Sequence, residues 1–191
     1  MRVLSRIPAA VVPCAAAVVL CASPVTAVAQ RAGTAPAAQQ APTKAAIVAA
    51  ARDVMQRARY ATFTTVDANG QPQSRVVDPL VPDAALVVWI GTNPATRKVA
   101  EVRARPRVSL LYFDATGLEY AMVTGTATIV TDRAEKAKHW KAEWAPFYPK
   151  RAEDPGYVLI RVVPSRVEVV SPRHSLMNDP KDWRPVGVNL P

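Results

Sequence analysis

Short apolar segments separated by turn residues fill most of the chain between residues 60 and 170, which is the pattern of β-strands joined by tight turns. Asp67–Gly70 and Thr116–Gly117 supply the turns, because asparagine and glycine tolerate positive φ at little cost. In the two longest segments, Gly125 indicates a β-bulge or the close approach of another backbone or a ligand, and Pro164 indicates a bulge or an edge position. The pattern predicts six strands, at residues 60–66, 71–79, 86–91, 108–113, 120–131 and 157–170.

Three helices are predicted beside these strands. The first runs from a Thr43 cap to about residue 59 and has one apolar face. A second begins at Asn93, with Pro94 in the first turn where its missing N–H costs nothing, and ends before residue 106. A third is capped by Asp132, with Glu135 completing a capping box. The apolar positions are Ile47, Ala51, Val54, Met55 and Ala58 in the first helix, and Ala137, Trp140, Trp144 and Phe147 along the third helix and its exit.

The order of elements is helix, three strands, helix, two strands, helix and strand. Because short connections make neighbouring strands antiparallel, the expected fold is mainly β (α+β), a small six-stranded antiparallel barrel with flanking helices. This domain covers residues 43–171, and a proline-containing extended tail follows at residues 172–191. We expect the tail to lie over a neighbouring subunit, with Trp183 as its anchor.

The first 29 residues have the features of a secretory signal peptide. Arg2 and Arg6 form a basic start, residues 7–28 are almost entirely apolar, and Ala27 and Ala29 place small side chains before a cleavage site. A permanent membrane helix is the competing interpretation, but three prolines interrupt the segment. Residues 30–42 are rich in Ala, Gln, Pro and Thr and predict a flexible linker. We therefore expect an exported protein, periplasmic or secreted, with no stable membrane span after cleavage.

Composition narrows the chemistry of the mature chain. Both cysteines, Cys14 and Cys21, lie in the signal segment, which excludes disulfides, thiolate catalysis and cysteine-bound metals after cleavage. The formal charge of +9 falls by two when Arg2 and Arg6 leave, and the remaining positive charge favours anionic partners. The basic residues are dispersed and lack interleaved aromatic side chains, which argues against nucleic-acid binding.

The junction between the third strand and the second helix is the strongest candidate for a binding site. Backbone N–H groups at a helix start attract anions, and Thr92, Arg97 and Lys98 add a hydroxyl and two cations. An ordinary capped helix with a solvated basic face would show the same spacing. Arg75 favours the anion site, because pairing of its strand with the strand at residues 86–91 would bring it beside Thr92. Together these residues predict a site for a phosphate group.

Residues that could carry catalysis are scarce. The only histidines, His139 and His174, are far apart in the sequence, and neither has a second ligand at metal-binding spacing, so no metal site is expected. The sequence contains no P-loop, no dinucleotide-type glycine pattern and no nucleophile motif. If the protein is an enzyme, a cofactor supplies the difficult step, and its catalytic residues stay unknown.

The segment TNPATRKVAEVRARPRVSLLYF, which starts at Thr92, resembles the flavin-binding region of the pyridoxamine 5′-phosphate oxidase-like family, the FMN-binding split barrels. The likeness extends to GQPQSRVV upstream and to VTGTATIV and PSRVEVV downstream, so it covers about residues 60–170. It implies a six-stranded split barrel that forms a homodimer, with FMN bound between the subunits. The helix with Trp140 and Trp144 is similar to the general stress protein branch of this family.

The resemblance also implies which residues bind FMN. One group would hold the phosphate, one glycine would allow close backbone approach, and the others would lie along the isoalloxazine ring. In that order they are Arg75, Thr92, Arg97 and Lys98, then Gly91, then Val76 and Val77 through their backbone, with Trp89 and Tyr120 as candidate ring neighbours.

Departures from the oxidases argue against pyridoxamine phosphate as the substrate. The oxidases follow the last strand with an Arg-x-His-Asp-Arg set that binds this substrate, whereas here Arg173 and His174 are adjacent and no second arginine stands at the right distance. Tyr120 and Val170 stand where the oxidases have glutamine and an aromatic residue. The expected function is that of an exported FMN-binding protein, a flavin-dependent oxidoreductase of an unknown small molecule. A non-catalytic flavin, deazaflavin or haem binding protein is the alternative.

Overall fold

A computed structural model describes residues 41–191 of the chain. The expected signal peptide and almost all of the expected linker at residues 30–42 lie outside the described residues. No helix within residues 41–191 combines the length and the apolar character needed to cross a bilayer. The elements in chain order are α1 (Lys44–Ala58), β1 (Ala61–Val66), β2 (Pro72–Val77), β3 (Val88–Thr92), α2 (Arg97–Ala104), β4 (Arg107–Asp114), β5 (Glu119–Val130), α3 (Arg133–Lys138), β6 (Val158–Val170) and β7 (Val186–Asn189), with short 3₁₀ turns at Ala142–Trp144, Arg151–Glu153 and Pro172–His174.

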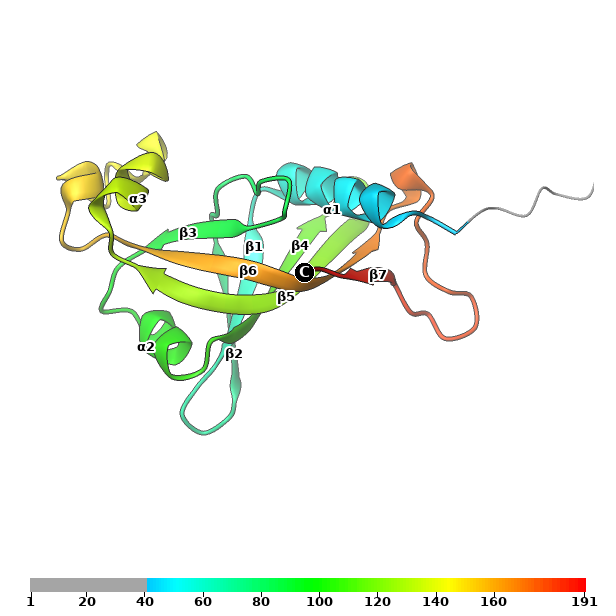
Figure 1. Cartoon of the computed structure of the whole chain (residues 1–191), viewed down its shortest axis with the longest axis horizontal. Coiled ribbons are helices and arrows are strands. Elements are labelled where there is room, and N and C mark those ends of the chain that lie inside the picture. Colours follow the sequence, from blue (N-terminus) through cyan, green and yellow to red (C-terminus); the bar gives the residue numbers. More distant parts are fainter. Residues whose placement is uncertain (1–40) are drawn as a thin grey trace, which may run out of the picture. The chain divides into compact units, whose positions relative to one another are not determined.

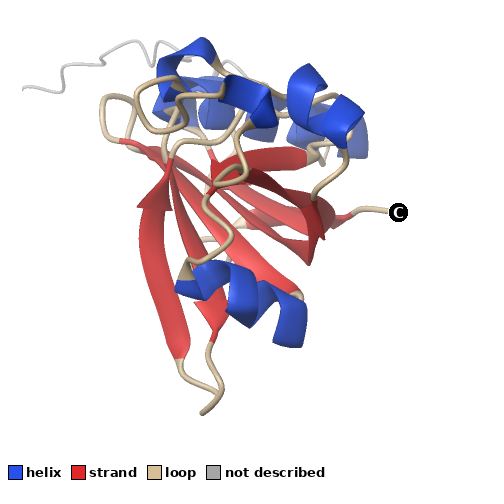
Figure 2. Ribbon diagram, turned by 90° about the vertical axis from the view of Figure 1, so that its left-hand side faces the viewer, coloured by secondary structure: helices blue, strands red, loops and turns tan. Residues whose placement is uncertain are grey.

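All strands pair antiparallel in one strongly curved sheet with the order β2-β1-β4-β5-β6-β3, and β7 pairs with β6 beside this path. The sheet curves into a half-barrel, with α1 along one end and α2 at the other, beside the β1–β2 hairpin (Figure 1 and Figure 2). This confirms the expected six-stranded antiparallel split barrel with flanking helices. The two terminal strands of the path, β2 and β3, are the strands that the sequence places one after the other, and no ladder joins them.

The long strands β5 and β6 bend where the sequence predicted a bulge. Their register shifts between Thr124 and Gly125, and Gly125 then lies opposite Pro164. A side chain on Gly125 would collide with the carbonyl of Val163, so only glycine fits this close approach of two backbones. Ser165 has no partner in the register with β5, and its hydroxyl donates to the Thr124 carbonyl at 3.2 Å. The bend lets one pair of strands serve both halves of the curved sheet.

The main core lies between α1 and the concave face of the sheet. Thr43 caps α1 as expected, since its hydroxyl accepts the Ala46 N–H at 3.2 Å. The apolar face of the helix is confirmed, with Ala58 only partly buried at its end. It packs against large buried side chains of the sheet, among them Phe63, Leu110 and Tyr112. The buried helix residues are Ile47, Ala50, Ala51, Val54 and Met55.

A second, smaller cluster of aromatic side chains covers the outer face of β3. Trp144 is buried against Tyr157, with ring centroids 5.9 Å apart, and Trp140 meets Tyr157 edge-on at 5.3 Å. The expected apolar side of the third helix is therefore formed mainly by the segment that follows it. Ala137 and Phe147 were wrongly assigned to this side, because both are exposed, Phe147 with 76% of its surface.

The start of α2 and the expected capping box of α3 differ from the structure. Helix α2 begins at Arg97, whereas Asn93 closes a separate turn by accepting the Ala95 N–H at 2.8 Å. Pro94 therefore lies in this turn and outside the helix. Asp132 caps α3 as expected, but the Glu135 carboxylate lies 3.3 Å from His139 Nε2 and does not return to the cap. At the start of α2, the short polar side chain of Asn93 favours a turn over an earlier start of the helix.

The C-terminal residues after β6 contain more structure than an extended tail. A 3₁₀ turn at Pro172–His174 is followed by an irregular segment, and then β7 adds four residues to the edge of β6. Trp183 lies in the irregular segment with 76% of its surface exposed. Its expected contact with a neighbouring subunit stays a prediction.

Candidate functional site

Thr92 and Lys98 meet where β3 ends and α2 begins. Residues alternate between the two faces of β3, so Thr92 shares the inner face with Val88 and Ile90 and is buried. Lys98, in the first turn of α2, donates from Nζ to Thr92 Oγ1 at 3.0 Å. The strand-to-helix junction therefore brings a hydroxyl and a cation together, as the sequence predicted.

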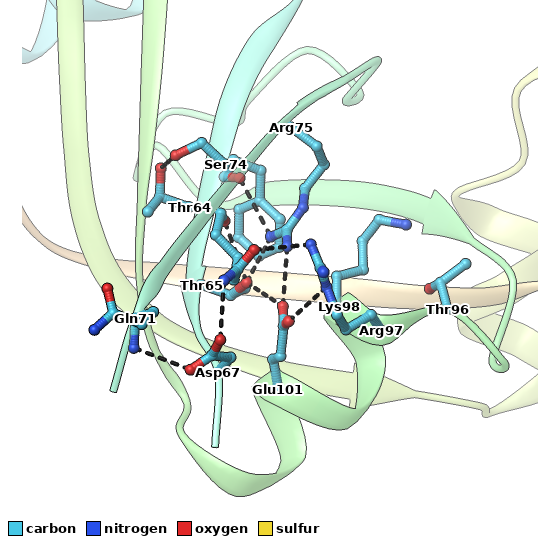
Figure 3. A network of polar contacts seen from close by, with 12 residues as sticks. Thr64, Thr65, Asp67, Gln71, Ser74, Arg75, Thr96, Arg97, Lys98 and Glu101 are labelled. Atoms are coloured by element: carbon cyan, nitrogen blue, oxygen red, sulfur yellow. Dashed lines mark hydrogen bonds and ion pairs between the residues drawn. The ribbon is translucent and has the colours of Figure 1, made fainter. Parts of the chain in front are cut away.

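Arg75 reaches the same region from β2. It is in register with Phe63, so its side chain points to the inner face of the sheet, where the guanidinium lies 5.9 Å from the Phe63 ring. Its Nη1 donates to Thr65 Oγ1 at 2.5 Å, and its Nη2 donates to Glu101 Oε2 at 3.0 Å. Figure 3 shows Arg75 and Thr65 converging on Glu101 from β2 and β1. These bonds fix the guanidinium on several sides.

Arg97 approaches Glu101 from one turn earlier in α2. Its Nε lies 3.0 Å from Glu101 Oε1, and its Nη2 donates to Gln73 Oε1 at 2.9 Å. Gln73 is on β2, so Arg97 links the helix to this strand as well. The Arg97 side chain is 67% exposed, which leaves its remaining donors open to solvent. We call Arg75, Arg97, Lys98 and Glu101, with the hydroxyls of Thr65 and Thr92, the cation cluster.

The cation cluster carries more positive than negative charge. Arg75 and Arg97 share one carboxylate, that of Glu101, and among the described residues no carboxylate lies within ion-pair distance of Lys98. Burial lowers the pKa of Lys98 below its usual value, and the neighbouring positive charge of Arg75 lowers it further, while Glu101 acts in the opposite direction. A partly buried ammonium whose charge is not balanced is a site that an anion would stabilise.

The structure corrects the expected route by which Arg75 joins the site. Within the described part of the chain, β2 pairs only with β1 and β3 only with β6, so the expected pairing of Arg75's strand with β3 is wrong. Helix α2 supplies the connection, because it carries Lys98 toward Thr92 and Glu101 toward Arg75. Glu101 was missed by sequence reasoning. Its position four residues after Arg97, which puts both on one face of a helix, was the available signal.

Trp89 and Gly91 occupy the opposite face of β3 from Thr92. Trp89 stacks on His139 with ring centroids 3.8 Å apart, and the Arg161 guanidinium lies 5.8 Å from its indole. A side chain on Gly91 would collide with the Trp144 ring, so this glycine is needed for close packing of that indole. Both residues thus belong to the aromatic cluster in this structure. Their expected contact with a flavin stays a prediction.

The other expected flavin neighbours are distributed along the sheet. Val77 is buried in the core, and Val76 points outward with 72% of its surface exposed. Tyr120 is partly buried at the start of β5, in register with Phe113 and Val170, and takes no part in the contacts of the cation cluster. Burial raises the pKa of Tyr120, and the charge of Glu168 adds to this effect.

The sequence model of pyridoxamine 5′-phosphate oxidase matches residues 47–171. The chain belongs to the pyridoxamine 5′-phosphate oxidase family. The match spans β1 to β6 and includes every member of the cation cluster. Among curated proteins, no sequence matches the chain significantly.

Solved structures related to this family show the same fold. A protein related to general stress protein 26 from Clostridium acetobutylicum has a TM-score of 0.64 at 19% identity, covering 77% of this chain and 96% of that one. General stress protein 26 from Bacillus anthracis gives 0.60 at 24% identity, with 75% and 98% covered. A pyridoxamine 5′-phosphate oxidase-related, FMN binding protein from Nostoc punctiforme gives 0.52 at 16% identity, with 79% and 97% covered. At these identities the likeness establishes the fold.

In this member of the pyridoxamine 5′-phosphate oxidase family, Arg173 and His174 are engaged in a second polar cluster. Its centre is Glu119, which is 1% exposed and accepts the Ser171 hydroxyl at 2.9 Å and the Arg173 backbone N–H at 3.2 Å. His174 Nδ1 lies 2.7 Å from Ser171 Oγ, and its Nε2 lies 3.7 Å from Asp53 on α1. We call these residues the Glu119 cluster. It fastens the end of β6 to β5 and α1.

Proposed function

We propose that this protein binds FMN and acts as a flavin-dependent oxidoreductase on a small molecule. The observation that carries the proposal is the excess positive charge of the cation cluster, above all the partly buried Lys98 with a hydroxyl as its partner. A phosphate monoester supplies the missing negative charge and several acceptor oxygens. Membership of the pyridoxamine 5′-phosphate oxidase family supports FMN as the molecule that carries this phosphate.

The residues present fit a phosphate group. Lys98 keeps donors free after its bond to Thr92, and the exposed Arg97 keeps donors free after its contacts with Glu101 and Gln73. Arg75 is held rigidly from β2, so a phosphate would meet a positioned guanidinium. In this assignment Arg75, Thr92, Arg97 and Lys98 hold the phosphate. The backbone of Val76 and Val77 then leads away from it along β2 and borders the ring.

The chain itself contributes binding and orientation. When bound, the flavin supplies hydride or electron transfer through its ring. Arg173 and His174, which stand in the region where the oxidases bind pyridoxamine phosphate, are already bonded to Glu119 and Ser171. This engagement supports a substrate other than pyridoxamine phosphate.

A second copy of the chain is the proposed partner. Val76, Leu111 and Phe113 present apolar side chains on the outer face of β2 and β4, and they are 72%, 41% and 55% exposed. The sheet register places Leu111 beside Met122 on β5, which continues the apolar surface. A homodimer that covers this face would lie against β2, the strand whose inner face carries Arg75. Light scattering tests this: a dimer is expected for the wild type and a monomer for Leu111→Asp, and a monomeric wild type contradicts it.

Titration of the purified protein with FMN, followed by flavin fluorescence and absorbance, tests the cofactor. Saturable binding at micromolar concentration is expected, and Arg75→Ala is expected to weaken it. Arg133→Ala is the matched control, because Arg133 is an exposed arginine paired with Glu153 far from the cluster in sequence. Absence of FMN binding, together with uptake of deazaflavin or a Soret band with haem, would replace FMN by that cofactor.

Turnover and export need separate measurements. Reduction of the bound flavin by NADH or NADPH, followed by reoxidation by an added quinone or nitro compound, would support an oxidoreductase. If the bound flavin accepts no electrons from these donors, the proposed oxidoreductase activity is contradicted and flavin binding alone stands. To test export, the full chain is expressed in a bacterium and the periplasmic fraction is isolated. Mass spectrometry of the protein in this fraction should show a chain that begins at Gln30. An uncleaved cytoplasmic product contradicts this part.

A further inference from the structure

The two sides of the cation cluster come from the two ends of the sheet. Arg75 is on β2, and Thr92 is on β3, and these strands are the first and last of the main path. No ladder of backbone hydrogen bonds joins them; one backbone bond, from Leu80 N–H to the Trp89 carbonyl at 2.8 Å, links the segment after β2 to β3. The side chains of α2 provide the contacts that link the two sides at the cation cluster itself.

Glu101 is the side chain of α2 that reaches β2. It is 5% exposed, and its two oxygens serve different partners. Oε2 accepts from Arg75 Nη2 at 3.0 Å and from Thr65 Oγ1, while Oε1 lies 3.0 Å from Arg97 Nε. Thr65 itself accepts from Arg75. One carboxylate thus joins β1, β2 and two turns of the helix (Figure 3).

From this arrangement we infer that Glu101 is a positioning residue, which holds Arg75 and Arg97 at the spacing that a phosphate group requires. The inference rests on the proposed function, because it concerns the same anion site. The hydrogen bonds from Arg75 and Thr65 to Oε2, together with the ion pair between Oε1 and Arg97, restrict both guanidinium groups before any ligand arrives. Binding then costs less side-chain entropy than it would with two free arginines.

The opposite role for Glu101 is that of a competing anion, and the two roles predict opposite effects. A carboxylate among the cations reduces the attraction for a phosphate, so its neutralisation would strengthen binding if charge alone mattered. If positioning matters more, neutralisation weakens binding. The geometry favours positioning, because Glu101 is buried behind the arginines it orients, and Lys98 stays free of it.

Glu101→Gln tests the inference with little change of volume. An amide presents oxygen to only one of the two arginines and directs N–H donors at the other. We expect the Kd for FMN to rise roughly tenfold, the size of effect expected for loss of a hydrogen bond to a charged group. Inorganic phosphate should compete with FMN less well against this variant than against the wild type. Glu153→Gln, which removes an exposed arginine-paired carboxylate elsewhere, should leave both constants unchanged.

A double-mutant cycle shows whether Glu101 acts through Arg75. In the Arg75→Ala background, Glu101→Gln is expected to have a much smaller effect on FMN binding than it has alone. If Glu101 has a purely structural role, Glu101→Gln should lower stability equally in both backgrounds. The interaction free energy between the two substitutions, measured from FMN binding, should then be zero. Thr65→Val supports the same cycle if Glu101→Gln does not fold, because it removes the hydroxyl that contacts both Arg75 and Glu101.

The outcomes separate the two proposals. If the wild type binds FMN and Glu101→Gln binds it equally well or more tightly, the positioning role is overturned and FMN binding stands. If the wild type binds neither FMN nor phosphate, the proposed function fails, and the positioning role fails with it. Weaker binding by Glu101→Gln, with coupling to Arg75, supports both.

Discussion

Two buried glutamates organise polar clusters in this protein, and the clusters differ in how their charge is balanced. Glu119 is bonded to Ser171 and Arg173, and Asp53 beside it faces His174 and Arg57, so acids and bases are matched. Glu101 faces two arginines, and Lys98 nearby has no acidic partner within ion-pair distance among residues 41–191. Balanced polar clusters stabilise a fold by themselves. A cluster with excess positive charge is completed by an anionic ligand. We therefore place the phosphate in the cation cluster and not in the Glu119 cluster.

Of these variants, Lys98→Met should show the largest difference between the two clusters in their effects on FMN affinity and on stability. Without the ammonium, FMN binding is expected to weaken about a hundredfold, as for a lost hydrogen bond between charged groups. The ligand-free protein should become more stable, because burial and the charge of Arg75, which lower the pKa of Lys98, disfavour its charged form in the fold. Calorimetry of binding and urea denaturation measure the two effects. A variant that loses stability and keeps FMN would contradict the assignment.

Glu119→Gln should produce the reverse pattern. The buried amide pairs less well with Arg173 and Ser171, and we expect a loss of about 2 kcal/mol of unfolding free energy. For a domain of this size this corresponds to a Tm lower by about 4–8 °C. FMN affinity of the folded variant should equal that of the wild type. A marked loss of affinity would show that the Glu119 cluster also belongs to the binding site.

The pH dependence of FMN binding sharpens the comparison further. The lowered pKa of Lys98 means that this residue loses its proton below its ordinary value of 10.5. Because the phosphate needs the ammonium, affinity should fall as pH rises through the lowered pKa, by up to about tenfold per pH unit. Lys98→Arg, which stays charged, should remove this component of the profile. Identical profiles for both proteins would assign the titration to another group, such as the flavin.

The sequence predicted what neighbouring residues determine and missed what the fold brings together. Thr92, Arg97 and Lys98 lie within seven positions, so a strand followed by a helix was enough to place them together. Arg75 was assigned to the site, but by a wrong strand pairing, because sequence order does not reveal that β2 and β3 end up at opposite ends of the sheet. The prediction therefore named residues that lie together in the structure but gave the wrong strand pairing as the reason.

The glutamates and the faces of β3 show a different limit. Glu119 and Ser171 are 52 positions apart, and no local pattern indicates that they are bonded. Glu101 is 5% exposed, and no pattern in the neighbouring sequence indicates this burial. Alternation along β3 placed Trp89 and Thr92 on opposite faces, a consequence of their odd spacing, and this was available from the sequence. The fold was predictable because strands and turns are local, whereas charge partners depend on distant contacts.

Asp53→Asn should have the smallest effect and marks the edge of the balanced cluster. The pKa of Asp53 is lowered, first by the hydrogen bond from Arg57, at 2.9 Å, and also by the nearby charges of Arg57, His174 and Arg173. A lowered acidic pKa contributes stability above the ordinary value of 3.8, and this is lost as pH falls through the lowered value. Because the pair is partly exposed, the loss at pH 7 should be only about 0.5 kcal/mol. Urea denaturation at neutral pH should resolve this difference, and in strong acid the two proteins should converge. A difference that persists in acid would mean that the asparagine disturbs packing against His174. The contribution of the Glu119 cluster to stability would then depend on the fit of its side chains as well as on their charges.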